Sequence, residues 1–220
     1  MDSVRNYGGF ELKIRPHSSD SCNVRELLGG SDAYLIPKDA KLVVDIGAYI
    51  GLVSLITARN GAEVYAFEPE EENYERLRYH VEVNGYSDKV HCINKGVGIP
   101  GKTKLYLNSI NFGSNSIDSS FYRGFDPDRY QMVDLVSVHS VFSEHKIDYC
   151  DFLKIDCECS EKDILEELDD SLAGKIGQIS VEIHKKEWVE GIVKKLDRWY
   201  KGRRTDRKGR IWVFRKEWSE

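Results

Sequence analysis

The stretch VVDIGAYIGLVSL, residues 43–55, decides the fold. An apolar run ends in Asp45, Gly47 and Gly51 flank the turn that follows, and a second apolar segment comes after the turn. This order predicts a buried strand, a tight loop and a helix. A dinucleotide loop reads Gly-x-Gly-x-x-Gly, because its second glycine lets the backbone approach a pyrophosphate. Here Tyr49 stands at that position, and the Gly-Lys-Ser/Thr of a Walker loop is missing too. The loop therefore favours a cofactor without a pyrophosphate.

Short apolar runs alternate with helical patterns from residue 41 onward. This alternation is typical of an α/β fold in which crossover helices connect parallel strands. We expect a mostly parallel, seven-stranded Rossmann-like sheet with helices on both faces and a C-terminal antiparallel hairpin. The expected strands are 41–46, 62–68, 89–95, 151–156 and 178–184, with an exposed edge strand at 102–108 and a hairpin from 201–205 and 210–216; the expected helices are 51–61, one opened by Pro69, 160–169 and 187–200.

The length and composition fit an ordinary globular protein. A chain of 220 residues suits one α/β domain with a short addition, and we expect an N-terminal extension at 1–40 that packs on a main domain at 41–220. No apolar run approaches the roughly 18 residues of a membrane span. Five cysteines without a Cys-x-x-Cys pair indicate reduced thiols and a cytoplasmic location. The net charge of −5 gives no overall attraction to nucleic acid.

S-adenosylmethionine fits both this loop and the end of the next expected strand. This cofactor has a ribose diol, an adenine, a sulfonium and an amino-acid end. Asp45 can accept from the ammonium group, and Gly47 lets the backbone lie close to the ligand. Glu68 ends the next expected strand, where its carboxylate can accept from both ribose hydroxyls and would repel a 2′-phosphate. The alternative is that Asp45 and Glu68 only cap helices.

Other candidate cofactor contacts surround these two acids. The third expected strand ends where adenine lies in such folds, so an asparagine there can bind the base edge, although a turn role is an alternative. The fourth expected strand ends in an acid that can line the methyl-transfer site. The full predicted cofactor set is Asp45, Gly47, Ala48, Tyr49, Gly51, Glu68, Pro69, Asn94, Lys95 and Asp156.

Candidate catalytic groups lie at the ends of the last two parallel strands. Asp156 and Glu158 come after one strand, and Glu182 and His184 end the next, so we expect them at one edge of the sheet. His184 is the preferred general base because the ordinary pKa of histidine is near neutral; a surface histidine is the alternative. Asp156 is a second candidate base. Lys154 shares a face with Asp156 and either assists catalysis or neutralises the acids.

A divalent cation is an alternative use of the same acids. Asp156, Glu158, Glu182 and His184 together offer oxygen and nitrogen ligands. A general base or a metal could assist loss of the acceptor's proton, and we favour the base and assign no metal to the site. Cys157 and Cys159 are alternate residues, and this spacing favours ordinary packing over a zinc site.

The chain resembles the FkbM family of S-adenosylmethionine-dependent methyltransferases. The resemblance rests on VVDIGAYIG, VYAFEPEEENYERLRYHVEVNG, DFLKIDCECSE and the upstream IRPHSSDSCNVRELLGG, which together span about 14–184. It implies a class I methyltransferase fold and O-methylation of sugars, lipids or secondary metabolites. It also implies roles for Arg15 and Asp20, which on their own would be surface charges. Cys159 departs from the family pattern, because it stands where that pattern has glycine.

The sequence leaves three functions open. The favoured one is O-methylation of a hydroxyl on a glycan, lipid or small metabolite. The second is methylation of an RNA base, for which the basic segment 201–210 could hold phosphates, although a solvated hairpin tip is the simpler interpretation. KIDCECSE lacks the proline-containing motif of RNA base methyltransferases, which argues against it. The third is a non-catalytic S-adenosylmethionine-binding domain. The unpatterned segment 109–130 is expected to cover the site.

Overall fold

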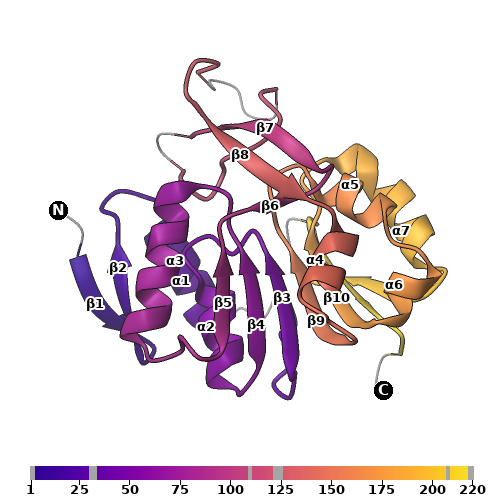
Figure 1. Cartoon of the computed structure of the whole chain (residues 1–220), viewed down its shortest axis with the longest axis horizontal. Helices are drawn as coiled ribbons and strands as arrows, with labels where there is room; N and C mark the ends of the chain where they lie inside the picture. The colour runs from indigo at the N-terminus through magenta and orange to yellow at the C-terminus, as the bar shows by residue number, and fades with distance from the viewer. Residues whose placement is uncertain (1–2, 30–33, 109–110, 121–125, 207–208, 218–220) are drawn as a thin grey trace.

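A seven-stranded sheet in the order β11-β12-β10-β9-β3-β4-β5 forms the centre of the molecule (Figure 1). The computed structural model describes residues 3–29, 34–108, 111–120, 126–206 and 209–217. Strands β10, β9, β3, β4 and β5 run parallel, and β12 is antiparallel to both β10 and β11. The mostly parallel sheet and its C-terminal hairpin are confirmed. The strands are β3 Leu42–Ile46, β4 Glu63–Phe67, β5 Val90–Ile93, β9 Cys150–Ile155, β10 Ile176–Glu182, β11 Lys201–Arg204 and β12 Ile211–Arg215.

Helices cover both faces of this sheet because its central strands are apolar on both sides. Val43 packs into one core cluster and its neighbour Val44 into the other, as the alternation of side chains along a strand requires. One face carries α2 and α3, and the opposite face carries α4 to α7. These helices are α2 Leu52–Arg59, α3 Glu71–Val83, α4 Val138–Glu144, α5 Glu161–Glu166, α6 Asp170–Gly174, the 3₁₀ turn η1 Lys186–Trp188 and α7 Val189–Leu196.

The N-terminal segment packs against the α2 and α3 side. It consists of β1 Ser3–Tyr7, β2 Phe10–Ile14 and α1 Asp20–Leu28. The inward residues Phe10, Leu12 and Ile14 join the same core cluster as α2 and α3. The backbone N–H of Lys13 donates to Nε2 of the buried His80 over 2.8 Å. Apolar and polar contacts thus tie β2 to α3.

A second, three-stranded sheet lies over the carboxyl ends of β3 to β5 (Figure 1). It contains β6 Gly96–Val97, β7 Gly101–Tyr106 and β8 Tyr130–Val136. The expected edge strand at 102–108 is β7, and it is an edge of this small sheet, because it pairs with β8. Leu105 of β7 and Leu135 of β8 line a cavity together with Glu68, at the end of the main sheet where ligands bind in such folds.

Several element boundaries differ from expectation. The predicted strand at 178–184 is β10, which ends at Glu182, two residues before His184, and the predicted helix at 160–169 is α5, which ends at Glu166 and is followed by α6. Helix α3 begins at Glu71, because the carboxylate of Glu70 accepts from the N–H groups of Glu72 and Asn73 and makes Glu70 the N-cap. The predicted helix at 187–200 is a 3₁₀ turn followed by α7, which ends at Leu196. Among the described helices, none is both long and apolar enough to cross a membrane.

Candidate functional site

The loop after β3 is shaped by its glycines. Gly47 has a φ of +74°, and a Cβ there would lie 1.8 Å from the carbonyl oxygen of Asp156, so only glycine fits. Gly51 has a φ of +88° and caps α2. The N–H groups of Gly47 and Ala48 donate to the carbonyl of Phe67 over 3.0 and 2.9 Å. The close approach at Gly47 is thus to the end of β9, which brings Asp156 against the loop.

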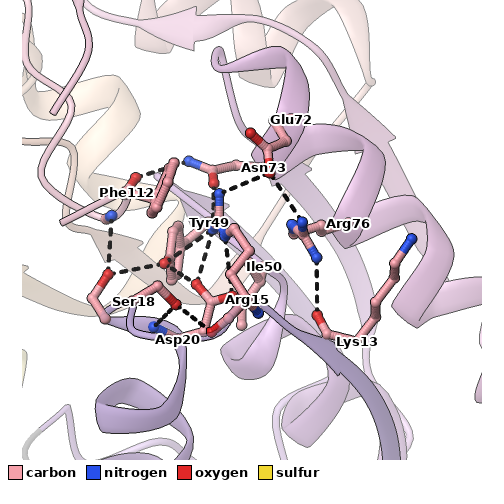
Figure 2. Close-up of polar contacts among 12 residues, drawn as sticks. Lys13, Arg15, Ser18, Asp20, Tyr49, Ile50, Glu72, Asn73, Arg76 and Phe112 are labelled. Atoms are coloured by element: carbon pink, nitrogen blue, oxygen red, sulfur yellow. Dashed lines mark hydrogen bonds and ion pairs between the residues drawn. The ribbon is translucent and has the colours of Figure 1, made fainter. Parts of the chain in front are cut away.

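Tyr49 keeps a left-handed backbone although it is not glycine. Its φ is +54°, a conformation that costs an L-residue about 1 kcal/mol. Its phenol is held from the N-terminal segment: Tyr49 donates to Asp20, and Arg15 donates to the phenol oxygen over 3.1 Å (Figure 2). Ser19 lies within hydrogen-bond distance, 3.0 Å. These contacts hold the loop where a second glycine is missing.

Arg15 and Asp20 form a buried ion pair, so the alternative that they are surface charges is wrong. They are 5% and 0% exposed, and Nη2 of Arg15 lies 2.9 Å from Oδ1 of Asp20. The same Nη2 donates to Oδ1 of Asn73 over 2.8 Å, and the guanidinium lies 4.2 Å from the ring centre of Phe112 (Figure 2). One pair therefore connects the N-terminal segment, the glycine loop, α3 and the segment at 111–120.

Glu68 lies at the carboxyl end of β4 and is 6% exposed. Its Oε2 accepts from the N–H of Tyr49 over 2.8 Å and its Oε1 from the N–H of Glu70 over 3.0 Å. Burial raises the pKa of Glu68, whereas these two N–H groups lower it; burial has the larger effect, and the pKa is about 7. Each carboxylate oxygen has a second lone pair, so the group can still accept from a diol.

Asp45 is completely buried at the end of β3. Its Oδ2 accepts from the hydroxyl of Ser54 over 2.7 Å, and its Oδ1 lies 3.2 Å from Nζ of Lys154. Lys154 also donates to the carbonyl of Gly47 over 2.6 Å. Burial lowers the pKa of Lys154, but the charges of Asp45 and Asp156 outweigh it and raise the pKa. Asp45 and Lys154 therefore hold the glycine loop from beneath.

The predicted acids and His184 do meet at the carboxyl ends of β9 and β10. The imidazole is only 2% exposed, so the surface-histidine alternative is wrong. Its Nδ1 lies 2.7 Å from Glu161, and its Nε2 lies 3.1 Å from Glu158, 3.6 Å from Glu182 and 3.8 Å from Asp156. Four carboxylates surround one imidazole.

These contacts change the protonation of the cluster. Burial lowers the pKa of His184, but the hydrogen bond to Glu161 and the surrounding carboxylates raise it to about 10. This raised pKa favours the protonated imidazolium at neutral pH, which makes His184 a hydrogen-bond donor and argues against its predicted use as the general base. Burial raises the pKa of Glu158 to about 8, and burial together with the charge of Asp156 raises that of Glu182 to about 7.

The same groups are close enough to offer a metal ligand set. One ligand atom from each of Asp156, Glu158 and His184 lies within 4.8 Å of the others. The imidazolium already supplies positive charge between the acids, and a cation would have to displace its proton.

Two cavities open at this edge of the sheet and share Asn23, Gly47, Tyr49 and Asp156. The Glu68 cavity, about 670 Å³ including open space, is lined by Glu68, Pro69, Asp156, Glu158 and apolar residues such as Val97 and Leu135. The Tyr34 cavity, about 650 Å³, is lined by Tyr34, Ala48, Lys154, Asp156 and Glu182.

Some predicted contacts lie outside the two cavity linings. The side-chain amide of Asn94 donates to the carbonyls of Glu68 and Pro69 over 3.0 and 3.2 Å, so it supports the loop after β4. Lys95 lies near His145, whose pKa its charge helps to lower. Of the predicted residues, the described linings contain neither of these two, nor Asp45, Gly51 or His184.

Three contributors were missed from the sequence. Tyr34 and Asn23 come from the N-terminal segment and line the cavities, and Glu161 is the buried partner of His184. Acidic residues are common in the first turn of a helix because they interact favourably with the helix dipole. Glu161 stands in the first turn of α5, so its sequence position alone did not indicate a role in the site. The described part of the segment 109–130 places Phe112 and Gly113 at the Glu68 cavity.

Cys159 occupies a left-handed position. Its φ is +91°, and its N–H donates to the carboxylate of Glu161 over 3.1 Å. A glycine adopts this conformation without strain, which explains why the family pattern has glycine here.

Comparison with known proteins adds a family match. The family model of the methyltransferase FkbM domain matches residues 45–201. No curated protein matches the chain significantly.

Several solved structures share the fold. The chain is similar to methyltransferase FkbM from Methylobacillus flagellatus KT, with 17% identity and a TM-score of 0.51 over 80% of this chain and 44% of that one. It is similar to the 16S rRNA methyltransferase RsmC of T. thermophilus in complex with AdoMet and guanosine, with 12% identity and a TM-score of 0.52 over 99% and 50% of the two chains. The chain thus spans half or less of these relatives' length. Such identities show the fold alone, that of class I methyltransferases.

Proposed function

Because the chain belongs to the methyltransferase FkbM domain family, we propose that it transfers a methyl group from S-adenosylmethionine to a hydroxyl of a glycan, lipid or small metabolite. The observation that carries this proposal is the charge of the Glu68 cavity. Its described lining contains three acidic side chains, Glu68, Asp156 and Glu158, and no lysine or arginine. Glu158, whose pKa is about 8, is mostly protonated at neutral pH, so the negative charge of this lining grows as pH rises. A pyrophosphate would be repelled there, whereas a sulfonium cation and a ribose diol are attracted.

The predicted cofactor residues fit this ligand in two groups. Glu68, Pro69, Gly47, Tyr49 and Asp156 line the cavity and would contact the cofactor directly. Ala48 lines the adjoining Tyr34 cavity. Asp45, Gly51 and Asn94 support the loops that form the site, and the charge of Lys95 acts on His145.

S-adenosylmethionine, when bound, supplies an electrophilic methyl group. The task of the chain is to orient the acceptor hydroxyl and to remove its proton during attack. We assign proton removal to Glu182 or Asp156, because both line the Tyr34 cavity and the pKa of Glu182 is about 7. His184 and Lys154 are buried cations. Their positive charges hold these carboxylates in place and offset the repulsion between them.

RNA base methylation is the alternative, and the charges disfavour it. Arg203 and Arg204 are exposed on β11 and could contact phosphates, while Arg207 and Lys208 lie outside the described residues. Arg210, which directly precedes β12, is 49% exposed and lies 3.8 Å from Glu182. A phosphate chain that entered the site would meet the acid cluster, so a neutral acceptor is favoured.

Further assignments rest on the family and the sequence. We propose that residues 1–40 are an extension of a methyltransferase domain at 41–220, since β2 and α1 pack on its helices. We also propose a cytoplasmic location, because all five cysteines are free and Cys150 and Cys159 are buried as thiols.

Calorimetry tests the cofactor assignment. S-adenosylmethionine is expected to bind and NAD is not; binding of NAD alone would overturn the proposal. A screen of glycan, lipid and tRNA acceptors with labelled methyl donor, with and without a chelator, then separates hydroxyl from base acceptors and a metal-free from a metal-assisted site.

A further inference from the structure

Tyr34 reaches from the N-terminal segment into the acid cluster. It is 8% exposed, and its phenol donates to Oδ2 of Asp156 over 2.8 Å. The same phenol oxygen lies 3.4 Å from Oε2 of Glu182. One hydroxyl thus bridges carboxylates that belong to the ends of two neighbouring strands, β9 and β10.

The backbone of Tyr34 is anchored by polar side chains inside the sheet. The hydroxyl of Ser180 donates to the Tyr34 carbonyl over 2.6 Å, and the amide of Gln178 donates to the carbonyl of Leu35 over 2.9 Å. Ser180 and Gln178 are 0% and 4% exposed inside β10, among the apolar side chains of Ile176, Ile179 and Val181. A buried polar group in a strand is costly unless it is paired, so these two side chains are matched to the Tyr34 segment.

The surroundings keep the phenol a donor. Burial, with the charges of Asp156 and Glu182, raises the pKa of Tyr34 well above its ordinary value. Nζ of Lys154 lies 6.0 Å from the centre of the ring, so the ring also covers the Lys154–Asp45 pair. Since a neutral phenol has one proton, the shorter contact identifies Asp156 as its main acceptor.

We propose that Tyr34 is a positioning residue of the active site, whose phenol holds the carboxylates of Asp156 and Glu182 in one arrangement toward the bound ligands. This inference rests on the proposed function, because Asp156 lines both cavities and is assigned to the cofactor and to the acceptor. It gives the N-terminal segment a part in the site beyond packing.

The test compares Tyr34→Phe with Tyr200→Phe. Tyr200 is also buried, at 1% exposed, and its phenol donates to the carbonyl of Ala173 over 2.8 Å, away from the acid cluster. In crystal structures of the wild type and both variants, we expect the carboxylate of Asp156 to leave its place only in Tyr34→Phe. Calorimetry is expected to show S-adenosylmethionine binding weakened about three- to tenfold in that variant alone, as for one net hydrogen bond.

An Asp156 carboxylate that stays in place in Tyr34→Phe, with an affinity equal to that of Tyr200→Phe, would overturn the positioning role. If Tyr34→Phe does not fold, Ser180→Ala loosens the anchor while the phenol remains, and a smaller displacement of Asp156 is expected. A wild type that fails to bind S-adenosylmethionine refutes the proposed function, whereas the position of Asp156 still decides the role of Tyr34.

Discussion

The backbone N–H of Tyr49 donates to Oε2 of Glu68 over 2.8 Å, which links the glycine loop after β3 to the end of β4. Glu68 therefore has two functions in the proposed site. It shapes the loop through this bond, and it offers its remaining lone pairs to the ribose. The position where a dinucleotide loop has its second glycine is used here to orient the acid that we propose binds the sugar.

Replacing Glu68 with Ala is expected to weaken S-adenosylmethionine binding by about 1–3 kcal/mol, the range for losing hydrogen bonds to a charged group. Isothermal titration calorimetry measures the change. Glu63→Ala is the matched control, because Glu63 starts the same strand and is half exposed beside His91. Equal affinities for the two variants would remove Glu68 from the ribose site.

The affinity for S-adenosylmethionine is expected to depend on pH through Glu68. Its pKa is raised to about 7, so the carboxyl loses its proton as pH rises through that value. The ionised form is the better acceptor and the better partner for a cation. Affinity should therefore rise about tenfold from pH 6 to pH 8 and level off above, by proton linkage. An affinity that falls over this range would contradict the assignment.

His184→Gln is expected to destabilise the fold by about 3–5 kcal/mol at pH 7.5, as for a buried charge that loses its partner. The imidazolium is the central cation among four carboxylates, and glutamine carries no charge to offset them. Urea denaturation measures the loss. His139→Gln is the control, since His139 is 48% exposed and pairs with Asp169 at the surface. A loss no larger than that of the control would show that the ring is not the charge that holds the cluster.

Much of the fold can be predicted from local pattern. The apolar runs that became β3, β4, β5, β9 and β10 are short and bounded by turn residues, and a parallel sheet buried on both faces needs little else to be recognised. The acids at the ends of β9 and β10 were also predictable, because carboxyl ends of parallel strands meet at one edge.

The protonation of the site was not predictable. The raised pKa of His184 depends on Glu161, a residue of α5 that only the folded chain brings to 2.7 Å. Likewise, Tyr34 reaches Asp156 across most of the sequence. Contacts between distant residues leave no periodicity or spacing, so local pattern carries no trace of them.

The left-handed backbone at Cys159 predicts an unusual order of stabilities. Its φ of +91° strains any residue with a Cβ, so Cys159→Gly should be more stable than Cys159→Ala by about 1 kcal/mol. At Cys150, inside β9, the order should be reversed by about 0.5–1 kcal/mol, because glycine weakens a strand. Thermal denaturation of the four variants measures both differences. If the alanine variant is more stable than the glycine variant at Cys159 as well as at Cys150, the backbone at Cys159 is not strained.

Removing one member of the buried Arg15–Asp20 pair should destabilise the fold more than replacing both members with apolar residues. Asp20→Ala leaves Arg15, 5% exposed, without its partner and takes an acceptor from the Tyr49 phenol. The expected loss in unfolding free energy is about 3–5 kcal/mol, and the double variant Arg15→Met/Asp20→Leu should recover most of it, because apolar replacements leave no unpaired charge. Glu75→Ala is the control: it breaks an exposed pair with Arg78 and should cost at most about 1 kcal/mol. Urea denaturation compares all three, and a double variant no more stable than Asp20→Ala would mean that the network needs the charges themselves.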